Sequence, residues 1–260
     1  MGYWEERQAK AQERLTSKKV KEIEAQLKKY YSNSMKKVIG QFEQTYNKLL
    51  SSIDEGREPT PADLYKLDTY WQMQAQLKVV LQKLGDKQAK VFSEAFEMHF
   101  FEVYYSIAIP GTDAFNTIDK EMAQQMINQI WCADGKSWSQ RIWKNTELLQ
   151  EALNENLIDC VLTGKKVTQL KNLLQDQFGV SYSRADSIVR TELAHIQTQA
   201  ARKRYEDYGI TEVQVWADED ERRCDVCGEL HEKRFPIGGA MPIPAHPRCR
   251  CCIIPVVEVD

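Results

Sequence analysis

The sequence predicts a mainly α fold, in which an extended multi-helix body over residues 1–209 precedes a small β-containing module over residues 210–260, an α+β arrangement. Three observations support this prediction. Apolar residues recur every three or four positions through most of the first 209 residues, the chain of 260 residues holds only 12 glycines, and β-like alternation appears only after Gly209. A chain of this length can bury a sizeable core without disulfide staples.

The first half of the chain is expected to be helical. One long helix is predicted to end before the loop SSIDEGREPT at residues 51–60. Thr60, Pro61 and Asp63 then supply an N-cap, a proline at the first position and an acid at N3, which predicts a helix running to about Leu84. Gly85 is expected to stop or kink it, and the aromatic helix over residues 87–108 is expected to be core. The stripe of the first helix comprises Val20, Ile23, Leu27, Tyr31, Met35, Val38, Phe42, Tyr46 and Leu49.

Helical patterns continue in the second half, over residues 119–131, 138–163 and 168–178. Gly179 is expected to cap the last of these, and Ser183 with Asp186 forms a predicted capping box that opens a helix reaching Gly209. Strands are expected at TEVQVW (211–216), RFPI (234–237) and CIIPVVEVD (252–260), the last on a sheet edge because Pro255 lacks an amide proton. The predicted segments are 1–58, a long amphipathic helix; 59–137, a helical region; 138–209, a second helical region; and 210–260, a cysteine-bearing β module.

Charge and hydropathy narrow the range of partners. The net charge is −3, but residues 1–50 carry 11 Lys and Arg against 6 Asp and Glu, so the basic residues concentrate on the first helix. A protein that binds nucleic acid mainly through phosphates is usually more basic, so contact with DNA is permitted but not required by composition. No apolar run is long enough for a membrane span, and the charged start does not resemble a signal peptide. We therefore expect no membrane partner and a reducing compartment, where clustered cysteines hold metal or stay reduced more often than they form disulfides.

Residues 224–252 hold five of the seven cysteines and two of the four histidines. Cys224 and Cys227 form a C-x-x-C pair, and His246 and Cys249 repeat the same gap after an intervening loop. Two such half-sites can form a tetrahedral Zn²⁺ site, and Cys251 could replace Cys249 or His246 because alternate residues of an extended segment face the same way. We therefore expect a structural Zn²⁺ held by four of these five residues, with Cys252 facing away. Reduced thiols without metal, or a disulfide, remain alternatives.

The residues that could take part in catalysis each have a structural explanation as well. A nuclease of the His-Asn-His class needs a further ligand-bearing helix, for which the nine residues after Cys251 offer no pattern. Glu192, His195, Gln199 and Arg202 share one helical stripe that could serve acid–base chemistry, but a solvated or inter-helix polar face is the expected role. We expect His99 and His231 to be hydrogen-bonding residues, and Cys132 and Cys160 to be core residues.

Taken together in order, the C-terminal residues resemble a known family. The order is Arg190-Thr191-Glu192 on a helix, Trp216, Asp220 and Arg222 before the first cysteine pair, and His246-Pro247-x-Cys249-Arg250-Cys251. This resembles the head-morphogenesis domain of tailed-phage minor head proteins, the Mu F-like family, over about residues 140–260, so that residues 138–209 would be its helical part. The match departs from the family pattern in having Glu221 between Asp220 and Arg222, and an additional Cys252.

The resemblance implies a non-enzymatic minor capsid component that lies inside the virion head at the portal and acts in procapsid assembly, DNA packaging and DNA ejection. The portal protein is the implied partner, with the scaffold or major capsid protein and packaged double-stranded DNA as further candidates; assembly would take place in the host cytoplasm. Two alternatives stay open. The first is an enzyme, either a nuclease or an ADP-ribosyltransferase-like protein, that uses the Cys/His cluster or the Glu192/His195 stripe. The second is a stand-alone zinc adaptor. Arg190 and Glu192 superficially resemble ADP-ribosyltransferase residues, but the serine motif and the paired acidic motif of those enzymes are missing.

Overall fold

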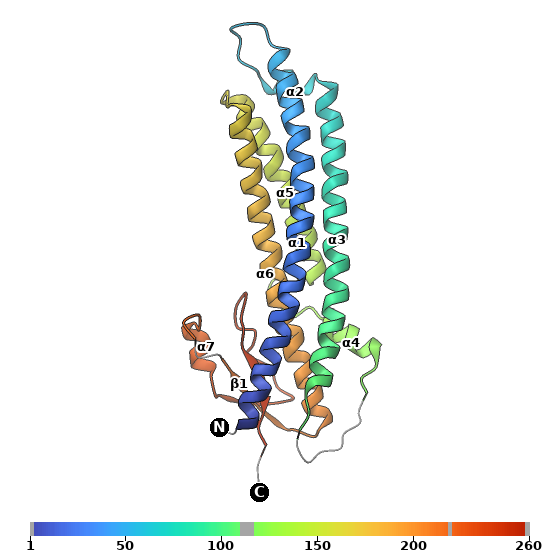
Figure 1. Cartoon of the computed structure of the whole chain (residues 1–260), viewed down its shortest axis with the longest axis vertical. Helices are drawn as coiled ribbons and strands as arrows, with labels where there is room; N and C mark the ends of the chain where they lie inside the picture. Colours follow the sequence, from blue (N-terminus) through green and yellow to red (C-terminus); the bar gives the residue numbers. More distant parts are fainter. Residues whose placement is uncertain (1–2, 110–116, 218–219, 258–260) are drawn as a thin grey trace. The chain divides into compact units, whose positions relative to one another are not determined.

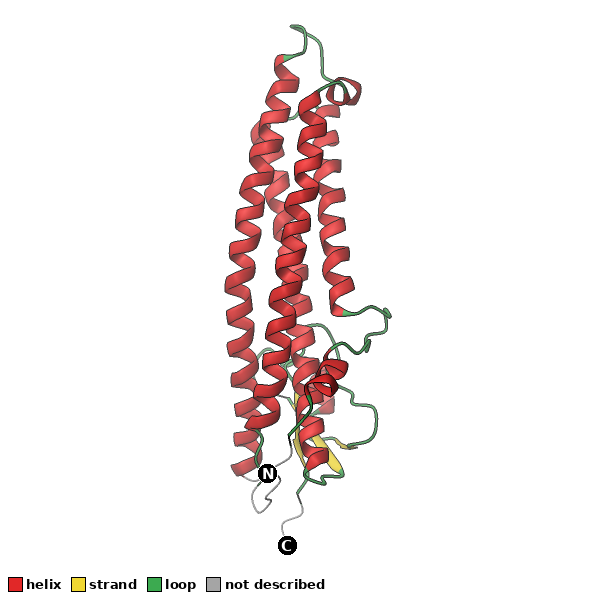
Figure 2. Cartoon of the chain, turned by 90° about the vertical axis from the view of Figure 1, so that its right-hand side faces the viewer, coloured by secondary structure: helices red, strands yellow, loops and turns green. Residues whose placement is uncertain are grey.

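The computed structural model describes residues 3–109, 117–217 and 220–257, and over these residues the chain is mainly helical with one small sheet (Figures 1 and 2). No described helix combines the length and the apolar character needed to span a bilayer. The elements in chain order are α1 (Tyr3–Ser51), α2 (Pro61–Tyr65), α3 (Asp68–Ser106), α4 (Lys120–Ile127), α5 (Trp138–Leu162), α6 (Val167–Asp207), β1 (Glu212–Trp216), α7 (Asp225–Leu230), β2 (Arg234–Pro236) and β3 (Cys252–Pro255).

The elements form two compact units, each assembled from separate stretches of chain. The sheet unit comprises Met1–Glu24, Val91–Trp138 and Ser187–Asp260, and the helix unit comprises Ala25–Lys90 and Ser139–Asp186. Helices α1, α3 and α6 therefore each contribute to both units. Each unit is discontinuous in sequence, because packing joins residues that are far apart in the chain.

The helix unit is built on apolar stripes with spacings of three and four residues, together with a few buried polar contacts. Its largest fully buried side chains include Leu27, Phe42, Tyr46, Leu49, Leu64 and Leu77. The hydroxyl of Tyr31 lies 3.2 Å from the Ser181 carbonyl oxygen, and the Asn145 amide donates to that same carbonyl oxygen at 2.8 Å. Burial raises the pKa of Tyr31 to about 12, so this hydroxyl stays protonated as a donor.

The expected helix stop at Gly85 is wrong, because α3 runs through this residue from Asp68 to Ser106. A Cβ atom at this position would lie 2.4 Å from Cζ3 of Trp143, which belongs to α5. The glycine therefore permits a close approach of an indole ring to the helix backbone. The capping box at Thr60 is confirmed, but the helix it opens, α2, ends at Tyr65.

The predicted helix end at Gly179 and the predicted helix start at Ser183 are also wrong, because α6 is continuous from Val167 to Asp207. A glycine inside a helix costs about 1 kcal/mol relative to alanine, which is less than the gain from burying several large apolar side chains. Phe178 before this point and Val189 after it are both buried. Burial of the helix on both sides of Gly179 therefore outweighs the local stop signal.

The sheet has the strand order β2-β1-β3, with both pairings antiparallel. Val213 and Val215 of the central strand are buried, and β3 is an edge strand, as Pro255 predicted. Helix α1 contributes to the core of this unit, since Nε2 of the fully buried Gln12 donates to the Tyr205 hydroxyl and to the Ile253 carbonyl oxygen, each at 3.1 Å. A three-stranded sheet of such short strands needs cover of this kind to be stable.

Candidate metal centre

The first cysteine pair is positioned by a helix start. Cys224 is the N-cap of α7 and Cys227 is its N3 residue, so the helical turn brings both sulfurs to one side. The Cys227 amide donates to Sγ of Cys224 at 3.4 Å, a bond that stabilises the thiolate form. Accordingly, the pKa of Cys224 is lowered by this contact. The sequence predicted a tight turn here, and the turn is the first turn of a helix.

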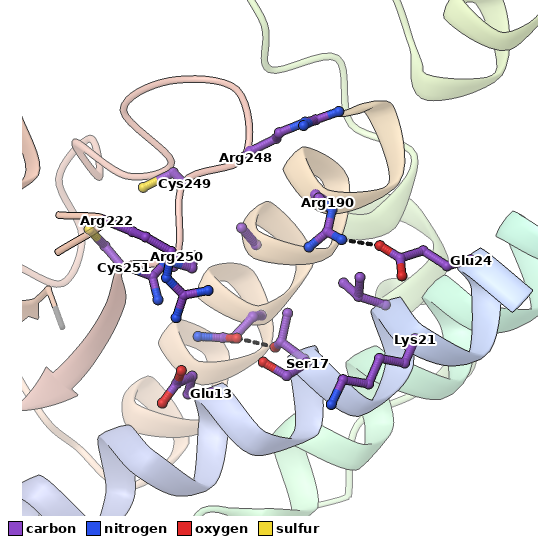
Figure 3. A pocket seen from close by; sticks show the side chains of 14 residues that line it. Glu13, Ser17, Lys21, Glu24, Arg190, Arg222, Arg248, Cys249, Arg250 and Cys251 are labelled. Atoms are coloured by element: carbon purple, nitrogen blue, oxygen red, sulfur yellow. Dashed lines mark hydrogen bonds and ion pairs between the residues drawn. The ribbon is translucent and has the colours of Figure 1, made fainter. Parts of the chain in front are cut away.

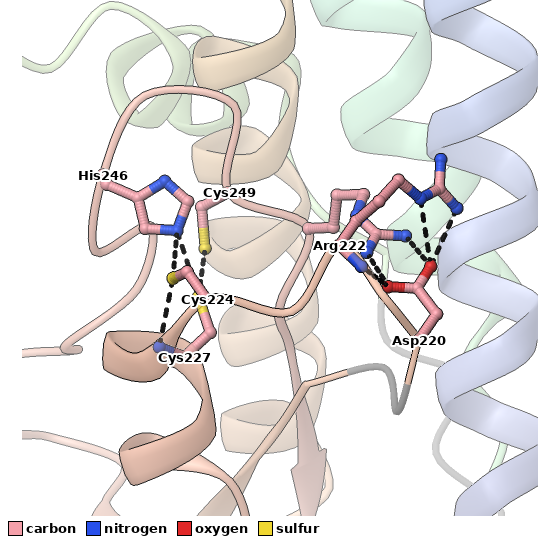
Figure 4. Close-up of polar contacts among 7 residues, drawn as sticks. Asp220, Arg222, Cys224, Cys227, His246 and Cys249 are labelled. Carbon is pink, nitrogen blue, oxygen red and sulfur yellow. Dashed lines mark hydrogen bonds and ion pairs between the residues drawn. The ribbon is translucent and has the colours of Figure 1, made fainter.

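The second half of the site comes from the segment before β3. Nε2 of His246 lies 3.2 Å from Sγ of Cys224 and 3.1 Å from Sγ of Cys227 (Figure 4). Sγ of Cys227 lies 3.8 Å from Sγ of Cys249. Two groups of possible ligands, each with all its donor atoms within 4.8 Å, therefore overlap at Cys227: one with Cys224 and His246, the other with Cys249 and Cys251.

The donor set fits a soft divalent metal of the zinc type. A tetrahedral Zn²⁺ with ordinary bond lengths separates two thiolate sulfurs by about 3.8 Å and a sulfur from an imidazole nitrogen by about 3.5 Å. The distance between the sulfurs of Cys227 and Cys249 matches the first value, and the distance from Sγ of Cys227 to Nε2 of His246 is shorter than the second. Nδ1 of His246 lies 2.8 Å from the Pro247 carbonyl oxygen, so a proton on Nδ1 leaves the Nε2 lone pair directed at the sulfurs. These residues could hold one metal ion.

The thiols already share hydrogen bonds that favour ionisation of one of them. Cys249 accepts a hydrogen bond from Cys251, and this contact lowers the pKa of Cys249 to about 5. The pKa of the donor, Cys251, is raised for the same reason. Since the thiolate is the form that binds a metal, Cys249 is the cysteine of this cluster that most readily ionises to a metal ligand.

An ion cluster ties the two chain segments of the site together. Asp220 accepts from both terminal nitrogens of Arg250, at 2.8 and 2.5 Å, and from Nη2 of Arg222 at 2.8 Å (Figure 4). The bidentate contact with Arg250 lowers the pKa of Asp220. The loop before the first cysteine pair is thereby linked to the residue between Cys249 and Cys251.

The Arg190-Thr191-Glu192 motif on α6 makes three different anchoring contacts. Arg190 forms an ion pair with Glu24 of α1. Thr191 Oγ1 accepts a 3.0 Å hydrogen bond from the backbone amide of Arg248, whose φ is +63°. The motif therefore holds the turn between His246 and Cys249 against α6, and positions the second half of the candidate metal site.

Glu192 has a structural contact of its own. The residue is 1% exposed, and its carboxylate accepts from Nε1 of Trp131 at 3.0 Å. The imidazole of His195 is 4% exposed and stacks on the same indole, with ring centroids 4.2 Å apart. Burial lowers the pKa of His195 to about 4. Glu192 and His195 are therefore buried against the loop between α4 and α5, so the solvated face that was one expectation for this stripe does not hold for these two residues.

The remaining sequence candidates also lie in packed surroundings. Trp216 packs against an apolar cluster of Ala9, Cys252 and Ile254, and makes an edge contact with the ring of His231. Nδ1 of His231 accepts from the Ala217 amide at 3.2 Å, and His99 is fully buried with Thr16 as partner. Cys160 is buried, as expected, whereas Cys132 is only partly buried.

Several residues that complete the site were not singled out from the sequence, namely Ala9, Gln12, Glu24 and Trp131. Each lies on another segment of the chain, and each is chemically ordinary in its own local pattern. Glu24, for example, is one of several acids on α1, and only its ion pair with Arg190 distinguishes it. Helical periodicity placed Ala9 and Gln12 on α1 but could not show which distant segment they would meet.

Comparison with known proteins gives a family match for the same part of the chain. Residues 151–254 match the sequence model of the family described as Phage Mu protein F like protein, which confirms the resemblance inferred from the motif. The chain is also 28% identical over 142 residues to NAD(+)--arginine ADP-ribosyltransferase EFV of Enterococcus faecalis (strain ATCC 700802 / V583). That alignment covers 48% of this chain and 29% of the relative, so the chain spans less than a third of that protein. No solved structure matches the chain.

Proposed function

Starting from the Phage Mu protein F like region that residues 151–254 form, we propose that this chain is a minor head protein with a structural role in head morphogenesis. The observation that carries the proposal is that the polar motif residues make anchoring contacts: Arg190 with Glu24, Thr191 with Arg248, and Asp220 with Arg250. Such contacts favour a scaffold over a catalytic centre. The protein would lie inside the virion head at the portal and act in assembly, packaging and ejection of DNA.

A structural zinc ion fits this role. Within the described residues between β1 and β3, the regular elements are the short α7 and β2, which cannot bury a core of their own. A metal held by Cys224, Cys227 and His246 together with Cys249 or Cys251 would join α7 to the segment before β3. Because the unfolded chain lacks this site, binding would stabilise the folded segment directly.

The helix unit offers a surface suited to a protein partner. Trp71 at the start of α3 is 60% exposed, yet its indole is held in place because Nε1 donates to the Tyr65 carbonyl oxygen at 3.0 Å. The rings of Tyr70 and Trp71 make an edge contact with centroids 5.1 Å apart. Rigid, exposed aromatic residues are typical binding anchors. Tyr70 and Trp71 would bind the portal protein, with the scaffold or major capsid protein as the other candidate partners.

Co-purification with the portal protein of the same phage tests the proposal. The parent chain should bind the portal, and Trp71→Ala should weaken binding by about 30-fold, which corresponds to a loss of about 2 kcal/mol at an anchor residue. Tyr105→Ala is the matched control, because Tyr105 is a 53% exposed aromatic residue in the sheet unit. Failure of the parent to bind the portal, scaffold and capsid proteins, together with its absence from particles, would refute the proposal.

The similarity to an arginine ADP-ribosyltransferase supports a second candidate function, transfer of ADP-ribose from NAD⁺ to arginine. The only acid of the Arg-Thr-Glu motif is Glu192, whose buried carboxylate is bonded to Trp131. Incubating the purified chain with labelled NAD⁺ and an arginine-rich acceptor should give no labelled acceptor. Transfer that is lost in Glu192→Gln, with folding retained, would favour the enzyme instead.

A further inference from the structure

A groove of about 640 Å³ lies in the sheet unit, next to the candidate metal centre (Figure 3). One wall is α1, whose lining residues run from Glu13 to Glu24, and α6 contributes a second set. Arg222 and the segment 248–251 line the other side. From Glu13 to Glu24 an α-helix rises about 16 Å. An extended peptide covers that length with about five residues, and the volume is within the range of ligand-binding clefts.

The exposed part of this groove is almost wholly basic. Four of its lining residues are exposed, and three of them are Lys21, Arg222 and Arg248, with Ser17 as the fourth. Figure 3 shows Lys21 on α1, and Arg222 and Arg248 on the opposite side. The net charge of the whole chain is −3, so this concentration of cations is local. A ligand that enters the groove would meet positive charges from two sides.

The two other cations of the groove, Arg190 and Arg250, are held by carboxylates. Arg190 pairs with Glu24, and Arg250 donates two hydrogen bonds to Asp220, at 2.8 and 2.5 Å. The five basic lining residues face three acids, Glu24, Asp220 and Glu13, so the groove keeps an excess of two positive charges. The exposed cations are therefore the groups that a ligand can use.

The backbone at Arg248 is itself unusual. Its φ is +63°, and its amide donates to Thr191 Oγ1 at 3.0 Å, which fixes the turn against α6. The left-handed region favours glycine, because a Cβ atom crowds the following carbonyl oxygen. The backbone therefore does not explain an arginine at this position. A role for its exposed side chain at the edge of the groove does.

The rest of the lining favours a peptide over a nucleic acid. Val20 of α1 and Ala194 of α6 are buried, so small apolar side chains of a peptide could pack over them. None of the described lining residues is aromatic, so an unpaired base has no ring on which to stack. The carboxylates of Glu13 and Glu24 would repel a phosphate backbone, whereas they can accept hydrogen bonds from peptide amides.

From this combination we propose that the groove binds an extended acidic segment of a partner protein, about five residues long, whose carboxylates contact Lys21, Arg222 and Arg248. Alternate side chains of an extended chain face opposite ways, so small apolar residues between the acids would face Val20 and Ala194. The inference goes beyond the proposed head-protein function and does not rest on it, because it depends only on the lining of the groove. Binding should weaken as salt is added, because the three cations are exposed.

Fluorescence anisotropy with a labelled, end-capped peptide EVEAE tests the site, with QVQAQ as its neutral counterpart. The full chain should bind the acidic peptide and not the neutral one. The double variant Lys21→Gln, Arg248→Gln should weaken binding about 10-fold, since two exposed ion pairs are lost. Lys21→Gln alone changes only an exposed helix residue and should weaken it about 3-fold. The control pair Lys10→Gln, Arg234→Gln removes the same charge from exposed side chains outside the groove and should bind like the parent.

Several outcomes would overturn the proposal. Absence of binding to EVEAE at low salt, or equal binding of QVQAQ, would refute it directly. Equal weakening in the control pair would show general charge attraction in place of a site. If duplex DNA displaces the peptide more effectively than poly-glutamate does at equal charge, the groove recognises phosphates and not carboxylates. Because Trp71 belongs to the helix unit and the groove to the sheet unit, each of these results is separate from the test of portal association.

Discussion

Acidification should destabilise this protein through two buried histidines, His195 and His99. Burial lowers the pKa of His195 to about 4 and that of His99 to about 3, whereas an unfolded histidine has a pKa of about 6.5. The unfolded state therefore takes up protons first as the pH falls. The stability that the neutral imidazoles contribute is fully present above pH 6.5 and is lost as the pH decreases from 6.5 toward 4.

The size of the effect follows from these values. At pH 5 the unfolded imidazole is almost fully protonated and the folded one is almost fully neutral, which costs about 2 kcal/mol for each histidine. The two residues together should lower the free energy of unfolding by about 4 kcal/mol between pH 7.5 and pH 5. Both side chains are buried, so solvent screening reduces this figure little.

Urea unfolding followed by far-UV circular dichroism at pH 7.5 and pH 5 measures the effect. The double variant His195→Phe, His99→Leu should lose about 4 kcal/mol less than the parent on acidification, because neither replacement titrates. Any packing cost of the replacements is present at both pH values and cancels. An equal pH dependence in parent and variant would refute the reasoning, as would NMR signals of the folded parent that are assigned to His195 or His99 by their loss in the variant and titrate near pH 6.5.

Two further predictions concern the metal site and a helix crossing. Elemental analysis of fresh, reduced protein should find about one zinc per chain. Cys227→Ser should abolish zinc binding while leaving most of the helical signal, whereas Cys132→Ser should keep the metal. A zinc-free parent of full stability would contradict the proposed structural zinc ion. Gly85→Ala should destabilise the chain by about 1–2 kcal/mol because its Cβ would meet the Trp143 ring. Gly40→Ala, whose Cβ would enter open space, should stabilise the chain slightly. Thermal unfolding in which both variants change the stability in the same direction would contradict this explanation.

Much of the helical framework was predictable, because helical periodicity depends on neighbours three and four positions apart. The stripe from Val20 to Leu49 lies in α1, the 211–216 strand became β1, and Pro255 lies on an edge strand. The same local reasoning failed at Gly85 and Gly179. At those positions a local stop signal competes with burial against distant segments, and only those segments decide the result.

Some residues of the candidate site could likewise be predicted from the sequence, and others could not. The spacing of Cys224, Cys227, His246 and Cys249 indicated which residue types could meet, since a gap of two residues lets a turn present two donors together. Their partners could not be predicted, because Glu24 is 166 positions from Arg190 and Gln12 is 241 positions from Ile253. By itself the sequence indicated which stretches are helical, where the strands lie and which residues could serve as metal ligands, but not where every helix begins and ends. Only the tertiary structure decided that α1 completes the sheet unit, because contacts over such separations depend on how the whole chain packs.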